Sequence, residues 1–371
     1  MTTAMAWFGW LALAVAGVVV LLVVGFIYLA VVLAWEEQHT RGSAYYGLPL
    51  AERQRFRRRL RLHARLLLPI LRLGPRVTEV TLPKSSFRYK GLAGPKGSCT
   101  EEGFARGHGY EPRPEDVFVV TQMKCGTTWM QHVVYQVLLR GGGDLAERGD
   151  ALYAVSPWLE GIKSVPMEQA RLIGTERPSR IIKTHFPADF CPFRSDARYI
   201  YVVRHPVSCF ASCVDFIRAN LGAFAPPVEH VRDWFCSDED MWWGSWPRHV
   251  DGWWKLSRSR ENVLFVRFED MKRDLAGVVR AVAVHLGIAA LSVEELDAIV
   301  TKCGFDYMRD HADSFEMQPP HLLAIDAELL VKGTADRYRD VPEDMRRVIM
   351  AWCFARLAEA DFPLAREYPS I

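Results

Sequence analysis

The chain has 371 residues, of which half are hydrophobic and 12% are aromatic. This composition excludes a chain that is disordered throughout, and the length suits one large α/β domain with additions, or at most two domains. The net charge of +2 gives no general affinity for nucleic acid, so no nucleic-acid partner is expected.

Residues 1–35 predict a transmembrane anchor. They contain no charged side chain, and the stretch from Trp7 to Ala34 is almost wholly apolar. As a helix this stretch would be about 42 Å long, which exceeds the roughly 30 Å of a bilayer's hydrocarbon core. A cleaved signal peptide normally has a charged start and a shorter apolar core, and both are missing. We therefore expect a single-pass membrane protein.

Residues 36–112 form a basic juxtamembrane segment and a lead-in. No lysine or arginine precedes the apolar stretch, whereas many arginines follow it. This asymmetry favours the cytoplasm for the rest of the chain, with a luminal domain as the alternative. Phe56, Leu60, Leu67 and Leu71 recur at helical spacing. Two interpretations stay open: an amphipathic helix lying on anionic lipid, or a helix with one face on the following domain. The scattered Gly, Pro, Ser and Lys of residues 77–112 predict a mostly irregular lead-in.

Residues 113–371 alternate short apolar runs with helical segments. The runs cover residues 117–121, 180–183, 199–203 and 263–267, and the clearest helix covers residues 127–139. This alternation predicts an α/β fold with a P-loop-like parallel sheet flanked by helices. Ligands of such sheets bind at the carboxyl ends of the strands.

The first candidate site is the segment Thr-Gln-Met-Lys-Cys-Gly-Thr-Thr-Trp at residues 121–129. The segment predicts a strand, then a short loop with Lys124 and Gly126, and then a helix. The N-terminus of such a helix points free backbone N–H groups and the positive end of its dipole at a bound anion. The spacing differs from that of a Walker A loop. An ordinary strand–helix turn is the alternative, but the context favours a phosphate-binding loop.

Two further segments follow strand ends. Arg204 comes directly after the third run, with Ser212 eight residues later, and arginine suits bidentate phosphate contacts. Lys183 ends the second run and His185 follows it, and an imidazole pKa of about 6.5 suits a general base. The eight cysteines show no CxxC pair or zinc-like spacing, so no metal is expected.

Together these segments resemble the cytosolic sulfotransferase family over about residues 115–345. Residues 123–129 are similar to its 5′-phosphate loop Pro-Lys-Ser-Gly-Thr-Thr-Trp, with Met123 and Cys125 in place of Pro and Ser. Arg204 and Ser212 match its 3′-phosphate motif. The resemblance implies transfer of a sulfonate group from 3′-phosphoadenosine-5′-phosphosulfate (PAPS) to a hydroxyl or amine of a small acceptor.

The resemblance also implies roles for individual residues. His185 would be the general base, Lys124 would meet the charge on the leaving 5′-phosphate, and Lys183 would stabilise the transferring sulfonate. The implied nucleotide-binding residues are Lys124, Cys125, Gly126, Thr127, Thr128, Trp129, Arg204, Ser212, Phe268, Cys303, Lys332 and Gly333. A thiol at a helix N-terminus, as at Cys125, is also expected to have a lowered pKa.

The chain departs from the family in a way that leaves alternatives open. Val331 stands where the family has a phosphate-binding arginine, and we hypothesise that Arg337 or Arg339 supplies the missing charge. A non-catalytic membrane scaffold with this fold and a P-loop-type kinase remain as alternatives. Residues 144–175 and 214–245 are expected to contain the substrate loops. They are apolar and aromatic, which predicts a hydrophobic acceptor that partitions into the membrane.

Overall fold

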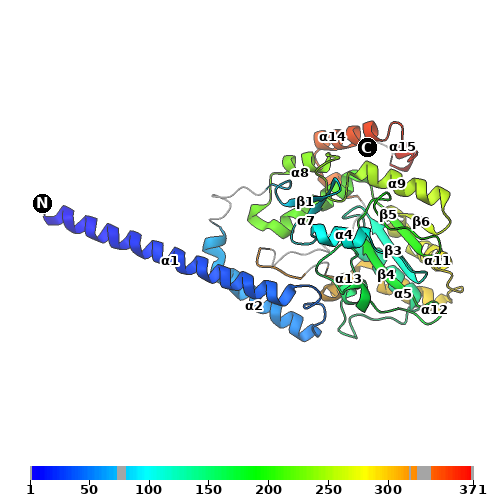
Figure 1. Ribbon diagram of the computed structural model, residues 1–371, viewed down its shortest axis with the longest axis horizontal. Helices are drawn as coiled ribbons and strands as arrows, with labels where there is room; N and C mark the ends of the chain where they lie inside the picture. Colours follow the sequence, from blue (N-terminus) through cyan, green and yellow to red (C-terminus); the bar gives the residue numbers. More distant parts are fainter. Residues whose placement is uncertain (1, 73–80, 317–318, 324–335, 369–371) are drawn as a thin grey trace.

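A computed structural model describes residues 2–72, 81–316, 319–323 and 336–368 (Figure 1). Its centre is a parallel four-stranded sheet with the order β4-β3-β5-β6. The strands are β3 (Asp116–Thr121), β4 (Arg180–Thr184), β5 (Arg198–Val203) and β6 (Val263–Arg267). Val119 lies opposite Lys183 on one side and Ile200 on the other. The predicted parallel sheet is confirmed.

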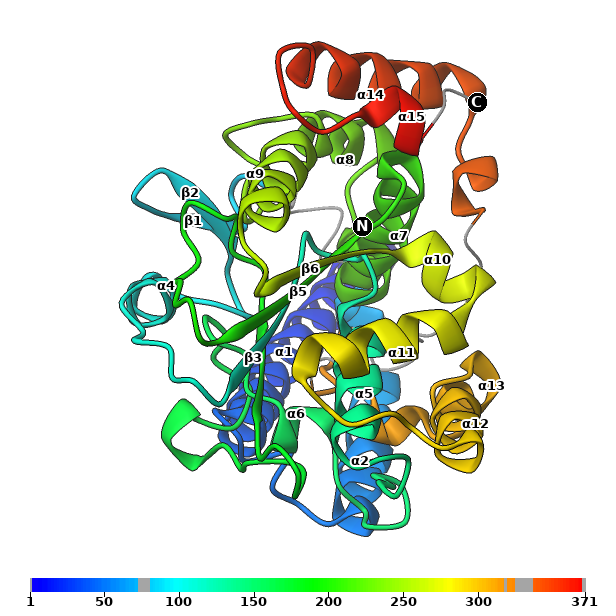
Figure 2. The ribbon, with the colours of Figure 1, turned by 90° about the vertical axis from the view of Figure 1, so that its right-hand side faces the viewer.

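Helices cover the sheet because its apolar strands must be buried on both faces. α5 (Thr127–Leu138) and α11 (Leu275–Leu286) pack together beside the strands, and α9 (Trp246–Ser259) packs along β6. Figure 2 shows α5 and α11 on one side of the sheet and α4 (Glu101–His108) on the other.

Further helices connect these elements and complete the domain. They are α6 (Leu152–Val155), α7 (Pro206–Leu221), α8 (Val228–Phe235), α10 (Phe268–Arg273), α12 (Val293–Lys302), α13 (Phe305–Asp310), α14 (Glu343–Arg356) and α15 (Leu364–Glu367), with short 3₁₀ turns at Met167–Gln169, Gly222–Phe224, Ala312–Ser314 and Arg337–Asp340.

The predicted irregular lead-in is wrong for residues 86–95 and 101–108. β1 (Ser86–Tyr89) and β2 (Leu92–Pro95) form an antiparallel hairpin, and α4 follows. The hairpin turns at Lys90 and Gly91, which both have positive φ, as a tight two-residue turn requires. The Thr100 side chain then accepts a hydrogen bond from Gly103 N and begins α4.

α1 (Thr2–Thr40) and α2 (Leu50–Leu71) form a helical hairpin that projects from the sheet domain (Figure 1). α1 continues as a helix past residue 35, because its last turns pack against α2. A Cβ atom at Gly25 would overlap the Ile70 side chain, so the two helices approach closely there. The Tyr28 hydroxyl lies 2.7 Å from His63 Nδ1. α1 is therefore joined to the rest of the protein by packing as well as by the chain.

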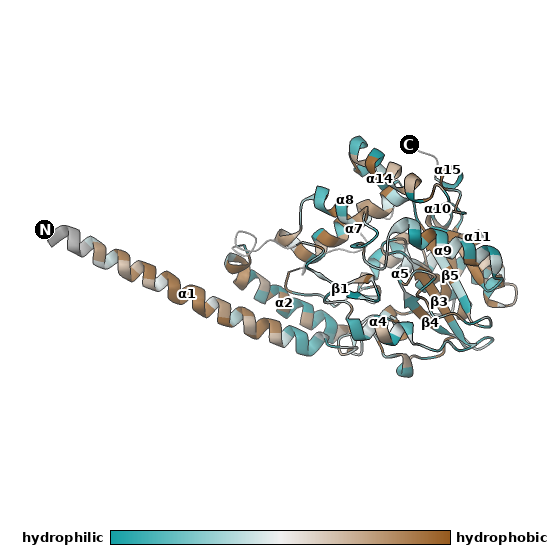
Figure 3. Cartoon of the chain, turned by 45° about the horizontal axis from the view of Figure 1, so that its top comes forward, coloured by the Kyte–Doolittle hydropathy of each residue, from teal (hydrophilic) through white to brown (hydrophobic). Residues whose placement is uncertain are grey.

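The apolar stripe of α2 packs inward. Phe56, Leu60 and Leu67 are buried, and the Trp35 ring stacks on Phe56 with ring centres 4.8 Å apart. Figure 3 shows hydrophobic residues along most of α1 and many hydrophilic residues on α2. Of the two interpretations of this stripe, the structure favours the helix with one face on folded protein.

Among the residues that the structure describes, two stretches are long and apolar enough to cross a membrane, Trp7–Thr40 and Pro206–Phe224. The first is almost entirely exposed, whereas the second belongs to α7 and lies against the sheet domain. Phe210 and Ile217 of α7 are buried in the core. α1 is therefore the candidate for a membrane span.

Candidate active site

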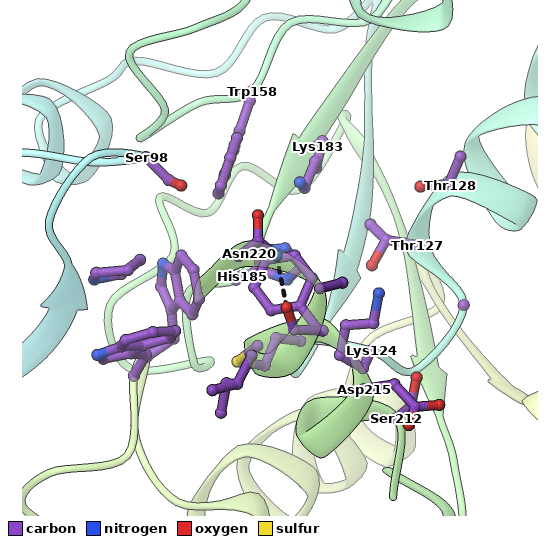
Figure 4. A pocket seen from close by; sticks show the side chains of 18 of the residues that line it. Ser98, Lys124, Thr127, Thr128, Trp158, Lys183, His185, Ser212, Asp215 and Asn220 are labelled. Atoms are coloured by element: carbon purple, nitrogen blue, oxygen red, sulfur yellow. Dashed lines mark hydrogen bonds between the residues drawn. The ribbon is translucent and has the colours of Figure 1, made fainter. Parts of the chain in front are cut away.

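The carboxyl ends of the four parallel strands converge on one cavity of about 450 Å³. β3 leads to Lys124, β4 to His185, β5 to Arg204 and β6 to Phe268. The predicted site residues that line the cavity are Lys124, Gly126, Thr127, Thr128, Trp129, Lys183, His185, Arg204, Ser212 and Phe268. Figure 4 shows Lys124, Thr127, Thr128 and Lys183 around one common space.

The loop between β3 and α5 depends on a glycine. Gly126 is the N-cap residue of α5 and has a φ of 103°, in the region that favours glycine. A Cβ atom there would lie 2.7 Å from Phe268 Cδ2. The hydroxyls of Thr121 and Thr127 lie 2.6 Å apart and join the strand to the first turn of the helix. The open N-terminus of α5 thus faces the cavity, where its N–H groups favour an anion.

Two lysines give the cavity a buried positive charge. Burial is the main cause that lowers the pKa of Lys124 to about 8 and the pKa of Lys183 to about 7. The Lys183 ammonium lies 3.5 Å from the centre of the Trp158 ring. Two ammonium groups held out of water are stabilised by a bound anion, so the residues present fit a phosphate or sulfonate group.

His185 is held as a neutral imidazole. Its Nδ1 atom lies 2.9 Å from the Thr121 carbonyl oxygen, so Nδ1 carries the proton and donates it. Burial, with the charge of Lys183, lowers the pKa of His185 well below its ordinary value of 6.5. Nε2 therefore keeps a free lone pair. The ring packs against both Trp158 and Trp243, whose ring centres are 5.6 and 4.7 Å away.

Glu160 positions this segment, and the sequence analysis missed it. Its buried carboxylate accepts hydrogen bonds from His185 N at 2.8 Å and from the Thr184 hydroxyl at 2.9 Å. Residues 157 and 158, just before Glu160, pair with β4: Lys183 N donates to the Pro157 carbonyl at 2.8 Å, and Trp158 forms a parallel bridge with Lys183. The sequence placed Glu160 in a presumed substrate loop, and no local signal distinguished it from a surface glutamate.

Arg204 and Trp129 enclose Phe268. The Arg204 guanidinium lies 4.3 Å from the centre of the Phe268 ring, and the Trp129 ring meets Phe268 edge-on. The Trp129 indole N–H donates to the Cys303 carbonyl at 2.7 Å. Lys272, which the sequence analysis did not select, also lines the cavity and lies 5.2 Å from the centre of the Trp129 ring. This end of the cavity combines aromatic faces with cations.

Arg337 and Arg339 occupy different positions. Arg337 lines the cavity, is 8% exposed, and forms ion pairs with Asp215 at 2.6 Å and Asp340 at 2.9 Å. Arg339 is exposed and lies 3.2 Å from the Tyr338 hydroxyl. Of the two hypothesised replacements for the family arginine, the structure brings Arg337 to the site. Val331, Lys332 and Gly333 lie outside the described residues.

Two predicted nucleotide-binding cysteines turn their thiols away from the cavity. Cys125 is 1% exposed, and its Sγ atom lies 3.6 Å from Cys209 Sγ in the core. Burial raises the pKa of the Cys125 thiol well above its ordinary value, so the expected lowered pKa is wrong. The Cys303 thiol is also fully buried, and its backbone carbonyl makes the contact with Trp129. In both segments the backbone geometry turns the cysteine side chain into the core.

The rest of the cavity wall is largely apolar and aromatic. The predicted substrate loops contribute Trp158, Lys163, Phe216, Leu221, Trp242 and Trp243. Other parts of the chain that were not predicted add Glu36, Leu82, Phe315 and Leu323. Within the described ranges, no three His, Cys, Asp or Glu side chains are grouped so that they could hold a metal ion.

Comparisons of sequence identify relatives of this chain. The family model for a sulfotransferase domain matches residues 114–358. Sulfotransferase 2B1 of Homo sapiens is 30% identical over 257 residues, which covers 67% of this chain and 67% of that protein. Sulfotransferase 1C2 of Oryctolagus cuniculus is 29% identical over 208 residues, covering 54% of this chain and 68% of its own.

Solved structures share the fold. Mouse sulfotransferase SULT7A1 complexed with PAP aligns with a TM-score of 0.57 at 21% identity, covering 76% of this chain and 96% of that one. Retinol dehydratase in complex with androsterone and the inactive cofactor PAP aligns with a TM-score of 0.60 at 21% identity, covering 78% and 95%. The sheet and its helices are therefore arranged as in these proteins.

Proposed function

Because this chain belongs to the sulfotransferase family, we propose that it transfers a sulfonate group from PAPS to a hydroxyl or amine of a small, hydrophobic acceptor. The chain is an enzyme of the transferase class, as its named relatives are. One observation carries the proposal: a neutral His185 and two buried lysines line the same cavity, at the N-terminus of α5.

The geometry supports an in-line transfer in which the protein positions groups and neutralises charge. The donor supplies an activated sulfonate, whose bond to the 5′-phosphate oxygen breaks as the acceptor attacks sulfur. His185 Nε2 takes the acceptor proton. Lys124 neutralises the charge that grows on the leaving phosphate, and Lys183 stabilises the sulfonate oxygens.

The donor site is assigned to the α5 end of the cavity. Gly126, Thr127 and Thr128 would cradle the 5′-phosphate with the N–H groups of the first helical turn. Arg204 and Ser212, which also line the cavity, would hold the 3′-phosphate. That second phosphate distinguishes PAPS from ATP. Trp129 would pack against the adenine ring.

The acceptor is assigned to the aromatic part of the cavity. Trp158, Trp243 and Phe216 surround the approach to His185, and such walls bind apolar molecules. Retinol dehydratase, which shares the fold, has been solved with androsterone and PAP and also with retinol and PAP. Androsterone and retinol are both small, hydrophobic alcohols. A hydrophobic alcohol, phenol or amine is the class that we propose for this chain.

We also propose that α1 crosses a membrane once and that the sulfotransferase domain faces the cytoplasm. The support is the exposed apolar surface of α1 and the arginines that follow it, since basic residues favour the cytoplasmic side. Arg55, Arg58 and Arg61 of α2 are exposed, where they can meet anionic lipid.

A P-loop-type kinase is the competing assignment for the same loop. Its Walker lysine would follow the last glycine of the loop, whereas Lys124 precedes Gly126. A non-catalytic scaffold is the second competing assignment. It conflicts with the enzyme family to which the chain belongs, and with the presence of both Lys183 and His185 in the cavity.

Thermal unfolding of the full chain in detergent tests the donor assignment. We expect 3′-phosphoadenosine 5′-phosphate (PAP) to raise the Tm, and ADP and ATP to raise it much less. A ligand at a hundred times its Kd adds about 2.7 kcal/mol to the folded state, which shifts a midpoint measurably. If ATP with magnesium raises the Tm as much as PAP does, the kinase assignment is favoured. If no nucleotide raises the Tm, the scaffold assignment is favoured.

His185→Ala tests the transfer step. Turnover with radiolabelled PAPS should fall by at least 10²-fold, because the acceptor loses its general base, while the Tm shift with PAP is retained. His230→Ala is the matched control, since His230 is exposed on α8. Near-normal turnover in the His185 variant would reject the base assignment.

A further inference from the structure

The cavity has a second polar region next to the α1–α2 hairpin. Glu36 of α1, Lys163 and His321 all line the cavity, and Lys163 is close enough to act electrostatically on both of the others. Glu36 is only 9% exposed. A glutamate carried by the anchor helix therefore belongs to the wall of the same cavity that contains His185.

Glu36 also fixes a loop of the sheet domain. Its carboxylate accepts a hydrogen bond from the buried N–H of Leu322 at 2.9 Å, across 286 positions of the sequence. The neighbours of Leu322 in the described part of this loop, Pro319, His321 and Leu323, line the cavity. The helix that carries the anchor thus sets the position of a cavity wall.

A second set of contacts ties the hairpin to the same region. Arg53 of α2 donates to the Asp313 carbonyl at 2.7 Å, and the Tyr45 hydroxyl donates to the Glu316 carboxylate at 2.8 Å. Arg57 forms an ion pair with Glu316. These contacts flank Phe315, which is 3% exposed and also lines the cavity. The hairpin therefore holds this wall from two sides.

The hairpin places this wall close to the expected bilayer. A span from Trp7 to Tyr28 would be about 33 Å long, close to the roughly 30 Å of the hydrocarbon core. Glu36 would then lie about 12 Å beyond the end of the span along the helix. Leu62 and Leu66 are near His63 on α2, and His63 contacts Tyr28 at the end of this span. Both leucine side chains are more than half exposed. Figure 1 shows the segment around residue 315 beside the end of the hairpin that joins the domain.

We propose that the α1–α2 hairpin is part of the acceptor site, and that a membrane-dissolved amphiphile with a hydroxyl or amine enters the cavity beside Glu36. The proposal rests on the proposed function. Glu36 is a positioning residue in it: through Leu322 it holds the wall against which the apolar body of the acceptor lies. The reactive group of the acceptor then reaches His185 while its apolar body extends toward Leu82 and Leu323.

Photolabelling of the full chain in phosphatidylcholine vesicles tests the entry route. The probe is a long-chain alcohol with a photoreactive diazirine in its tail, and labelled peptides are identified by mass spectrometry. We expect labels on the cavity residues around Leu82 and 319–323 in addition to lipid-exposed α1. Labels confined to residues 7–28 would overturn the proposal.

Kinetics of Glu36 variants test the positioning role. In Glu36→Ala the KM for the long-chain alcohol should rise about tenfold, because the Leu322 N–H is left buried and unpaired, while kcat and the KM for PAPS change little. Glu36→Gln should restore most of the affinity, since its amide oxygen can still accept that bond. Glu37→Ala is the matched control, because Glu37 is exposed on the same turn of α1. Equal KM values in the Ala variant and the control would overturn the proposal.

PAP binding separates this inference from the proposed function. If PAP stabilises the full chain and its Glu36→Ala variant equally, the donor site is intact in both. Any change in labelling then reports how the long-chain alcohol enters the cavity. If PAP fails to stabilise the unsubstituted chain, the proposed function itself has failed. In that case the labelling pattern still decides whether an amphiphile enters the cavity beside Glu36.

Discussion

The imidazole of His185 and the backbone carbonyl of Thr121 are joined by a 2.9 Å hydrogen bond that fixes the tautomer of the ring. The acceptor is a main-chain atom at the end of β3, and His185 follows the end of the neighbouring strand β4. The sheet register itself therefore aims Nε2 into the cavity. The Thr121 hydroxyl lies 3.3 Å from the same Nδ1 atom and adds a side-chain contact to this arrangement.

This arrangement predicts a flat acid limb in the pH profile. The pKa of His185 lies well below 6.5, so the imidazole stays neutral as the pH falls toward 6 and loses its basic form only below the lowered pKa. At saturating PAPS, which keeps both buried lysines protonated, we expect kcat/KM for the acceptor to change less than twofold between pH 7.5 and 6. A decline with a midpoint near 6.5 would contradict the environment described for this ring.

The buried lysines predict that donor affinity weakens as the pH rises. In the free protein the pKa of Lys183 is about 7 and that of Lys124 about 8, and both amines must be protonated to bind an anion. Above these values each amine has to take up a proton on binding, which costs up to tenfold in affinity per pH unit. The Kd for PAP, measured by calorimetry, should rise at least tenfold from pH 7 to 9. Lys124→Ala, which removes the amine assigned to the 5′-phosphate, should bind PAP more weakly and with a shallower pH dependence; an equal slope would contradict the assignment.

The glycine of the phosphate loop gives a matched pair of substitutions. Gly126→Ala adds a methyl group 2.7 Å from Phe268 at a left-handed φ of 103°, whereas Gly91→Ala meets a similar φ of 80° with no atom within 4 Å. Both variants should lose about 1 kcal/mol to backbone strain. Only Gly126→Ala should also lose most of its PAP binding. Similar PAP affinities in the two variants would show that the close approach to Phe268 is unimportant.

Glu160 should act on turnover through the segment that it holds. Glu160→Ala leaves His185 N and the Thr184 hydroxyl without their buried acceptor, which commonly costs 1–3 kcal/mol. We expect kcat to fall about 10- to 100-fold, with partial rescue in Glu160→Gln, whose amide oxygen can replace one of the two acceptors. Glu168→Gln, at an exposed position, is the control. A loss of stability with unchanged kcat in the remaining folded enzyme would make Glu160 purely structural.

Arg337 and Arg339 should differ in their effect on nucleotide binding. Arg337 lines the cavity and Arg339 is exposed, so Arg337→Ala should weaken PAP about tenfold or more and Arg339→Ala should not. The loss should be smaller for ADP, which lacks the 3′-phosphate. If neither variant nor the double substitution changes PAP affinity, the charge that replaces the family arginine lies elsewhere.

The sequence was most informative where local signals agreed with the fold. The apolar run at 199–203 matches β5 to within one residue, because a strand buried on both faces needs no polar alternation. The run at 263–267 matches the partly buried edge strand β6. The phosphate loop was also visible, since Gly126 and the threonines belong to one strand–loop–helix unit. These features depend on neighbours in the chain.

Features that depend on distant contacts were not visible. Glu160 gains its role from pairing beside β4, and Glu36 from a contact with Leu322 far along the chain. The direction of the Cys125 side chain follows from the left-handed backbone at Lys124 and Gly126, which turns the thiol toward Cys209. Residue type alone gave no indication of these orientations.

The stiffness of the hairpin has a kinetic consequence. The Tyr28 hydroxyl contacts His63, Trp35 stacks on Phe56, and Arg53 donates to the Asp313 carbonyl, so these contacts connect the proposed span to the domain that contains the cavity. In a bilayer the enzyme and a dissolved acceptor would meet by lateral diffusion in two dimensions. The rate would then follow the mole fraction of acceptor in the lipid, so adding inert lipid would slow the enzyme while adding water would not.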